Sequence, residues 1–255
     1  MQEELESAVI AQQLAHKSVR KYRDEPVTDA QLELIVTAAQ RASSSSNLQV
    51  WSVIAVRDEA RKARLAEALG GHDYIASAPV FLVWVADLAR NESLLRAHGA
   101  EPETLGLIEN TLMCAVDVGI AAQNALLAAE SLGLGGVFVG GVRNNPAAVA
   151  AELQLPTHTF AIAGMSIGAP DPSEGTGVKP RLPLEGVLHR EIYDPERWRS
   201  AADDYEVSYE QYFAGQGHPG RSWARTVVGR LAKIAGLHGR HTMRASLRSQ
   251  GFDSE

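Results

Sequence analysis

Residues 111–145 read TLMCAVDVGIAAQNALLAAESLGLGGVFVGGVRNN, and the order of patterns in this stretch decides the fold. Apolar and small residues at helical spacing predict a long helix that packs closely against its neighbours. Glycines end that helix, residues 137–139 predict a short strand, and a second glycine pair follows. Asn145 then predicts the N-cap of another helix, with Pro146 at its first position.

Outside this stretch, helices are plentiful and strands are few. Residues 79–86 form a continuous valine-rich apolar run, which is typical of a central strand buried on both faces. The pattern predicts one sheet with helices, of the α/β or α+β class, and the strict alternation of a doubly wound fold is not evident. The expected helices cover residues 3–15, 28–39, 60–69, 102–132 and the segment from 146, and the expected strands cover 50–56, 79–86, 137–139 and 159–167.

The expected helix over 102–132 would be roughly 45 Å long. A helix this long and apolar exceeds what one small domain needs, which suggests a subunit interface. Asp117, Gln123 and Glu130 interrupt its apolar run, so we expect a helix buried in the protein and no membrane span. Beyond Asp194 the pattern becomes polar helix and turn, with no core of its own.

Composition limits the classes of function. The 255 residues carry a net charge of −7 and 45% of them are hydrophobic, as in an ordinary globular protein. The acidic balance argues against general nucleic-acid binding, which rests on an excess of Lys and Arg. The segment 218–248 is nevertheless basic, through Arg221, Arg225, Arg230, Lys233, Arg240, Arg244 and Arg248.

Cys114 is the only cysteine, so no disulfide can form within the chain. A reducing, cytoplasmic location is therefore expected. The acidic N-terminus lacks the apolar run of a secretory signal, which agrees with that expectation. Within its apolar helix, Cys114 is expected to be a small core residue and not a nucleophile.

Two cationic clusters lie in turns far apart in the sequence. His16, Ser18 and Arg20 would share one side of an extended segment. Lys179 and Arg181 flank a proline that fixes the backbone between them. Arginine offers a fork for phosphate oxygens and lysine a point charge, although each cluster taken alone is equally compatible with a solvated surface.

Two further segments fit the same ligand chemistry. The serine run 43–46 offers hydroxyl groups, with a solvated loop as the simpler alternative. Gly140 and Gly141 remove side chains from a backbone that a flat ligand can then approach, with plain turn glycines as the alternative. Their spacing is not that of a dinucleotide fingerprint, which leaves a strand and opens a helix. Together the four segments suit an organic phosphate with a polar ring.

The sequence predicts no metal site and no catalytic residue of its own. No metal-ligand spacing appears among the eight histidines, and the serines of 43–46 have no local base.

These segments resemble, in the same order, the family of NADPH-dependent flavin reductases and oxygen-insensitive nitroreductases. Residues 16–22 (HKSVRKY) are similar to the family's H-R-S-x-R motif, and 43–49 (SSSSNLQ) to its serine-rich loop. The stretch 122–145 is the most specific, and 179–183 (KPRLP) follows at the expected place. The likeness covers residues from about 10 to 190, and more loosely the rest.

The resemblance implies a nitroreductase-like α+β fold, with a central, mostly antiparallel sheet flanked by helices, a long central helix at a dimer interface and a C-terminal excursion. It implies an FMN-binding domain over residues 1–195. Residues 196–255 would form an extension that packs on the body or on the partner subunit and carries a basic NADPH loop. The protein would be a homodimer with two FMN sites at the subunit interface.

By motif, the FMN phosphate would be held by residues of both cationic clusters, and Arg20 would lie against the pyrimidine edge. His72 stands where the family often has glutamine after a glycine pair, so its protonation would matter. The NADPH loop would carry Arg221 and Arg225. The full set of cofactor-binding residues that the resemblance implies is His16, Ser18, Arg20, Ser44, Ser45, Ser46, Gln49, His72, Val139, Gly140, Gly141, Arg143, Lys179, Arg181, Arg221 and Arg225.

The implied reaction is hydride transfer from NADPH to FMN, followed by electron transfer to nitroaromatics, quinones or free flavin in a ping-pong mechanism. Its partners would be small flat electron acceptors, with no nucleic acid and no membrane. Two alternatives remain at this stage. A non-catalytic flavin-binding or storage protein would keep the phosphate cluster without NADPH turnover, and a purely structural dimerisation module would bind no flavin.

Overall fold

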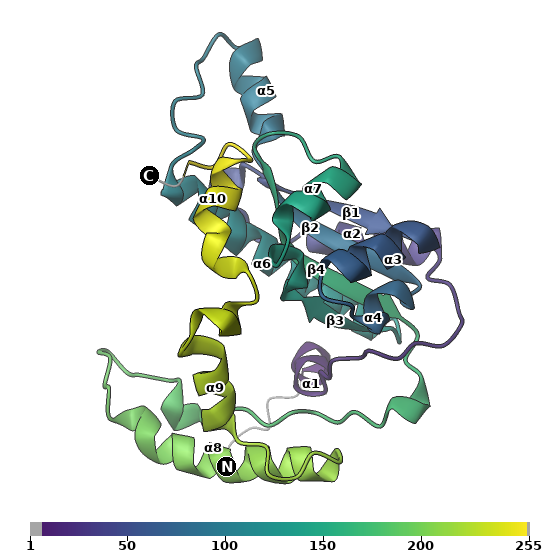
Figure 1. Cartoon of the computed structure of the whole chain (residues 1–255), viewed down its shortest axis with the longest axis vertical. Coiled ribbons are helices and arrows are strands. Elements are labelled where there is room, and N and C mark those ends of the chain that lie inside the picture. Colours follow the sequence, from purple (N-terminus) through teal and green to yellow (C-terminus); the bar gives the residue numbers. More distant parts are fainter. Residues whose placement is uncertain (1–6, 254–255) are drawn as a thin grey trace. The chain divides into compact units, whose positions relative to one another are not determined.

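Four antiparallel strands form the sheet in this computed structural model, which describes residues 7–253. Their order is β1-β2-β4-β3, so the sheet is antiparallel throughout (Figure 1). The α+β prediction is therefore confirmed. The strands are β1 (Trp51–Val56), β2 (Val80–Asp87), β3 (Gly135–Val139) and β4 (Thr159–Gly168).

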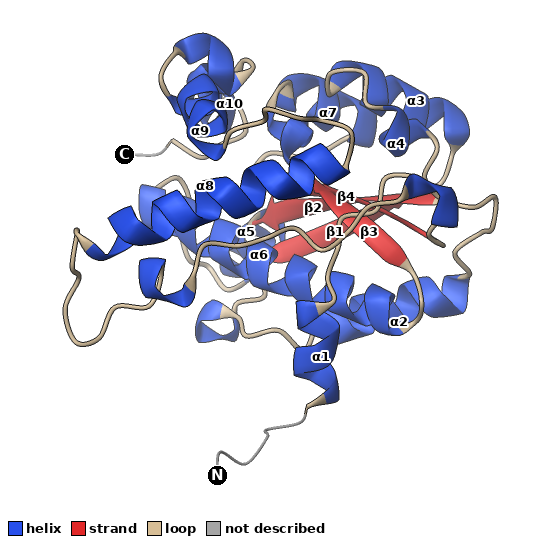
Figure 2. Ribbon diagram, turned by 90° about the horizontal axis from the view of Figure 1, so that it is seen from below, coloured by secondary structure: helices blue, strands red, loops and turns tan. Residues whose placement is uncertain are grey.

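Helices cover both faces of the sheet (Figure 2). On one face α2 (Asp29–Ala39) and α6 (Ile108–Ser131) bury Trp84, Met165 and their neighbours. On the other face α3 (Glu59–Ala68), α4 (Asp73–Ala76) and α7 (Pro146–Leu153) enclose a second cluster around Phe81. Strand β2 lies between these clusters with seven buried residues, as its continuous apolar run predicts.

A third cluster closes the end of the sheet where β2 ends and β4 begins. Phe252, from the end of the chain, is fully buried there, with its ring edge-on to that of Phe160. Cys114 is also fully buried in this cluster, and burial raises the pKa of its thiol to about 12. The expected core role of Cys114 is confirmed, since a thiol with such a pKa is a poor nucleophile at neutral pH.

Helix α6 begins six residues later than the sequence pattern predicts. Leu107, with φ −66° and ψ 147°, is its extended N-cap, and turns occupy the preceding residues. Gly106, within these turns, lies close to Asp253: a Cβ there would be 3.1 Å from Asp253 Oδ2. A helix that the pattern did not predict, α5 (Ala89–Ala97), precedes these turns.

Two opposite sides of α6 are apolar. One packs on the sheet through Cys114, Val118, Ala121, Ala122, Ala125, Leu126 and Ala129. The other leaves Ile108, Leu112, Val116 and Ile120 between 41% and 57% exposed. By length and composition α6 is the one helix of residues 7–253 that passes as a membrane span, with 44% of its most apolar window buried, and the core helices of soluble proteins pass the same test.

Local signals explain the ends of two helices. Thr28 and Gln31 form the capping box predicted at the start of α2. The Asn145 side chain accepts a hydrogen bond from Ala148 N at the start of α7, with Pro146 at the first position. The first helix is shorter than the expected 3–15: α1 covers Ala8–Leu14, has no buried residue, and residues 3–6 lie outside the described range.

The letters G-M-S-I-G at residues 164–168 match the elbow of serine hydrolases, but not its geometry. They lie inside β4, with Ser166 fully buried, whereas an elbow exposes its serine at a turn between a strand and a helix. The two glycines serve packing: a Cβ at Gly164 would lie 2.5 Å from the Phe81 ring, and one at Gly168 would lie 2.6 Å from Pro79.

The chain forms two compact units. One comprises Met1–Glu174 with Gly239–Glu255, and the other comprises Gly175–His238. The functional division expected at residue 195 is a different kind of boundary and stays a prediction. The second unit contains η4 (Leu184–Gly186), α8 (Arg197–Gly215), α9 (Trp223–Leu231) and η5 (Ile234–Leu237), and the first also holds η1 (Ser45–Asn47), η2 (Gly140–Arg143), η3 (Pro172–Glu174), η6 (Arg240–Thr242) and α10 (Met243–Arg248).

Candidate functional site

The N-terminal motif lies along the β3 edge of the sheet. Val19 is buried and its N–H donates to Gly136 O at the start of β3. Tyr22 forms an isolated bridge with Pro170, just beyond β4. Val19 is buried in this extended segment, whereas His16, Ser18 and Arg20 are half-buried.

Arg20 is the first member of a group of side chains at this edge. Its backbone N–H donates to Glu174 Oε1 at 2.8 Å, and its guanidinium carbon lies 5.9 Å from the centre of the Tyr74 ring. The Tyr74 ring in turn stacks on His72 at 5.2 Å between centroids. Burial raises the pKa of Tyr74, while Arg20 opposes that shift. His72 and Arg20 therefore lie on the two sides of one aromatic ring.

The glycine pair after β3 joins the same group. A Cβ at Gly141 would lie 3.1 Å from Leu69 O, so the residue needs to be small. A Cβ at Gly140 would lie 3.3 Å from the Arg143 guanidinium and 3.4 Å from that of Arg240. Two cations thus flank the backbone at Gly140. Val139, the last residue of β3, is buried and directly precedes this turn.

Asn144 links the glycine pair to the other members. Its Oδ1 accepts from Arg240 Nε at 2.8 Å, and its Nδ2 donates to Leu69 O at 3.2 Å. The Arg143 guanidinium donates to Ile162 O, which fixes it against β4. We refer to Arg20, His72, Tyr74, Gly140, Gly141, Asn144 and Arg240 as the β3-edge cluster.

His16 lies next to this cluster and is bound to α6. Its Nδ1 is 2.5 Å from Glu130 Oε1, with side-chain exposures of 26% and 8%. The Glu130 contact occupies one nitrogen of the ring and leaves the other for a ligand.

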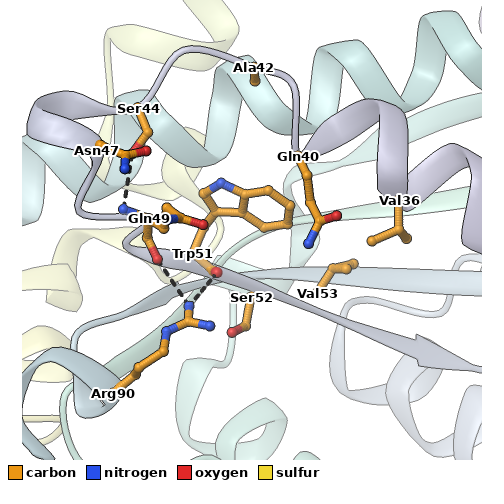
Figure 3. Close-up of a pocket in the computed structure, with 10 residues that line it drawn as sticks. All are labelled: Val36, Gln40, Ala42, Ser44, Asn47, Gln49, Trp51, Ser52, Val53 and Arg90. Atoms are coloured by element: carbon orange, nitrogen blue, oxygen red, sulfur yellow. Dashed lines mark hydrogen bonds between the residues drawn. The ribbon is translucent and has the colours of Figure 1, made fainter. Parts of the chain in front are cut away.

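The serine run is not a plain solvated loop. The buried Asp117 of α6 accepts hydrogen bonds from Ser44 Oγ at 2.8 Å and from the Ser45 backbone N–H. Ser44 Oγ itself accepts from Gln49 N, and Arg90 holds Gln49 O from outside (Figure 3). This loop, residues 43–49, forms one wall of a cavity of about 260 Å³ beside Trp51. We call it the serine loop.

The N-terminal motif and the serine loop lie at opposite corners of the sheet. The serine loop leads into β1 at the end where β2 finishes, whereas residues 19–23 lie beside the end of β4, at the opposite edge. The ten residues of β4 span roughly 30 Å. On α6, Asp117 and Glu130 are about 20 Å apart along the axis. One chain therefore does not bring Ser44, Ser45, Ser46 and Gln49 to the same ligand ring as Arg20.

The remaining predicted site residues belong to the second unit. Arg181 donates to the carbonyls of Lys179 and Pro180, which curls this short segment on itself. The Arg221 guanidinium lies 4.4 Å from the Phe213 ring centre. Arg225 N donates to Ser222 Oγ at the N-terminus of α9. All of these contacts lie within the second unit.

Two protein-family models match this chain. The model of the nitroreductase family matches residues 14–169, and the model of the nitroreductase C-terminal domain matches residues 179–255. The chain belongs to the nitroreductase family. The family resemblance of the sequence motifs is therefore confirmed.

Characterised members of the nitroreductase family are similar over most of the chain. FMN reductase [NAD(P)H] of Bacillus subtilis is 38% identical over 94% of this chain and 96% of its own length. The oxygen-insensitive NADPH nitroreductase of Salmonella typhimurium is 41% identical over 79% of this chain and 81% of its own.

Solved structures of nitroreductases share the fold. NfrA2 of B. megaterium superposes with a TM-score of 0.92 at 36% identity, covering 98% of this chain and 100% of that one. NADPH:FMN oxidoreductase from Vibrio harveyi, solved in complex with NAD+, gives a TM-score of 0.86 at 37% identity with the same coverage.

Five residues near the candidate site were missed by reasoning from the sequence. Tyr74 and Asp117 had no motif to mark them, and Arg240 was only one of seven cations in a basic segment. Glu130 and Asn144 lie within the stretch 122–145 but were not assigned to the site. A lone carboxylate within an apolar helical run was the one available signal for Asp117. Metal binding has no support in the described range, because no group of three or more His, Cys, Asp or Glu side chains in residues 7–253 is placed to hold an ion.

Glu206 generates a testable prediction for the basic segment. Its carboxylate accepts from the backbone N–H groups of Trp223 and Ala224, at the start of α9. Hydrogen bonds from Ser222 and Ala224 lower the pKa of Glu206. Because the folded pKa is lowered, the stabilisation is present above the ordinary glutamate pKa and is lost as pH falls through the lowered value.

Glu206→Gln should therefore lower the free energy of unfolding at pH 7 by about 1 kcal/mol, and the loss should be smaller at pH 4, below the ordinary glutamate pKa of 4.5. Urea unfolding at both pH values measures this difference. Glu210→Gln, an exposed change on the same helix, is the control. Equal losses at both pH values would contradict the assigned role of the carboxylate.

Proposed function

We propose that this protein is an FMN-dependent NADPH oxidoreductase that reduces nitroaromatics, quinones or free flavin. The observation that carries the proposal is the β3-edge cluster, in which cations flank a glycine backbone that has no side chain in the way. The names of the similar proteins support it, since they include FMN reductase, NADPH-flavin oxidoreductase and NADPH nitroreductase.

The residues of the cluster fit FMN in their chemistry. A flavin needs donors and positive charge at its pyrimidine edge, and Arg20 supplies both. It needs a flat approach to its ring, and a Cβ at Gly140 would project towards the guanidinium groups of Arg143 and Arg240. His16 and Ser18 provide donors for the phosphate. We assign Lys179 and Arg181 of the second unit to the same phosphate.

In the reaction, bound FMN supplies the ability to take a hydride from NADPH and to pass electrons to an oxidant. The protein binds and orients the reactants, with no acid or base of its own. Arg20 stabilises the negative charge that reduction brings to the pyrimidine edge. Arg143, Arg221 and Arg225 are assigned to the NADPH phosphates, and Val139 and His72 to contacts with the ring.

The serine loop completes the site only in a homodimer. Ser44, Ser45, Ser46 and Gln49 of one chain lie too far from its own Arg20, so we assign them to the flavin held by the partner. The exposed apolar row on α6, Ile108, Leu112, Val116 and Ile120, provides a surface for a second copy. Its side chains follow one another at a spacing of one helical turn.

A flavin-binding or storage protein without turnover is the alternative function. It would share the phosphate cluster and the dimer, and would differ in its response to NADPH. The relatives named as reductases argue against it. The cytoplasmic location expected from the lone cysteine stays a prediction.

The proposed function predicts a characteristic absorption spectrum. Purified protein should show a flavin absorption spectrum, which NADPH should bleach in the absence of oxygen and a nitroaromatic or quinone should restore. A flavin spectrum that NADPH leaves unchanged would favour the storage protein. Protein that is colourless and fails to bind added FMN would refute the cofactor assignment.

The second prediction concerns Arg240. Because its guanidinium lies beside Gly140 and is oriented by Asn144, we assign it to an anionic group of the nicotinamide substrate. Arg240→Gln should raise the KM for NADPH about tenfold and leave FMN content unchanged. Steady-state kinetics with a neutral quinone as acceptor measures this.

Arg244→Gln serves as the control for Arg240→Gln, because Arg244 is exposed on the adjoining helix α10. An unchanged KM for NADPH in Arg240→Gln, or an equal rise in both variants, would contradict the assignment.

A further inference from the structure

Asp117 is a buried carboxylate in the middle of the apolar helix α6. It is 3% exposed, and its neighbours Cys114 and Val118 are fully buried. Burying a carboxylate is costly unless hydrogen bonds compensate for the lost water. A carboxylate in this buried position therefore needs hydrogen-bond donors close to it.

Those donors come from the serine loop. Every hydrogen bond that the Asp117 carboxylate makes with the described residues is donated by Ser44 Oγ, at 2.8 Å, or by the Ser45 N–H, at 3.1 and 3.2 Å. Ser44 Oγ passes the constraint on, because it accepts from Gln49 N at 3.0 Å. One carboxylate thus fixes both ends of the loop.

The loop needs this support because its backbone is unfavourable by itself. Ser46, Asn47 and Gln49 have φ values of 48°, 55° and 53°, in the left-handed region that side chains other than glycine rarely adopt. Such conformations persist only where surrounding contacts determine them. On one side of the loop Arg90 donates to Gln49 O (Figure 3) and Asn91 donates to Leu48 O. On the other side, Asp117 accepts from Ser44 and Ser45.

We infer that Asp117 is a positioning residue for FMN binding. It touches no ligand itself, and it acts by holding the serine loop in the conformation that meets the flavin of the partner subunit. This inference rests on the proposed function, in which the serine loop contributes to that site. It also ties the loop to α6, whose opposite side carries the exposed apolar row.

Asp117→Asn is the direct test because it keeps the shape and removes the charge. The amide keeps one oxygen as an acceptor. Its NH2 group replaces the second oxygen, so a donor then faces a donor of the loop. The dissociation constant for FMN, measured by fluorescence titration of stripped protein, should rise about tenfold to a hundredfold. Hydrogen exchange of peptides covering residues 43–50 should become faster, without a matching change in β2.

Two further variants separate positioning from general damage. Glu109→Gln removes the same charge from an exposed position in the first turn of α6 and should leave FMN affinity and loop exchange unchanged. Ser44→Ala keeps the carboxylate in place and should weaken FMN binding in the same direction. If Asp117→Asn does not fold, hydrogen exchange of residues 43–50 in flavin-free Ser44→Ala provides the test, because loss of a direct contact with the flavin would not speed exchange there. In the double variant the two effects should add incompletely, because both remove the hydrogen bond between Ser44 and Asp117.

The outcomes distinguish this inference from the proposed function. Wild-type affinity for FMN in Asp117→Asn and Ser44→Ala would overturn the inference and leave the function standing, as would a loss of thermal stability with unchanged affinity. Wild-type protein that does not bind FMN would refute the function, and the exchange experiment would still show whether Asp117 holds the loop.

Discussion

The pairing of β4 on both sides is the constraint on which the first unit depends. The strand is fixed between β2 and β3 by backbone hydrogen bonds, and the missing side chains at Gly164 and Gly168 admit Phe81 and Pro79. Strand β4 pairs with β2 over residues 159–167 and with β3 over its last five residues, 164–168. It therefore sets the distance between the corner that holds the N-terminal motif and the corner that holds the serine loop.

Helix α6 connects the two corners. Glu130 binds His16 near one corner, and Asp117 binds the serine loop near the other. The exposed row of apolar side chains runs along the same helix, on the side away from the sheet. In our account a second copy packs on that row and brings its serine loop to the first copy's flavin. Dimer formation and cofactor binding would then be linked through one helix.

Sequence patterns predicted the parts of the fold that local chemistry controls. The capping box at Thr28, the proline after Asn145 and the apolar run of β2 each act within a few residues, and each prediction is confirmed. The start of α6 was predicted wrongly: residues 103–106 form turns, and Gly106 among them lies close to Asp253, which is distant in sequence. Helix α5 was missed, since its nine residues have no buried apolar face to mark them.

The candidate site was predictable to a similar extent. Motif likeness identified the segments that supply cations, hydroxyls and glycines, but it gave no distances between them. The separation of Arg20 from Ser44 follows from strand register, and the contact of Arg240 with Asn144 follows from the return of the chain to the first unit. The role of Asp117 also depends on the tertiary structure, because its hydrogen-bond partners are more than 70 residues away in sequence.

Subunit complementation tests the central claim, that each site takes residues from two chains. Arg20→Ala and Ser45→Phe should each abolish tight FMN binding in homodimers. When the two variants are co-expressed with different tags, the purified heterodimer should recover one FMN per dimer, because one of its two sites then combines an intact Arg20 with an intact serine loop. A heterodimer that binds no FMN would contradict the claim and would place all site residues within a single chain.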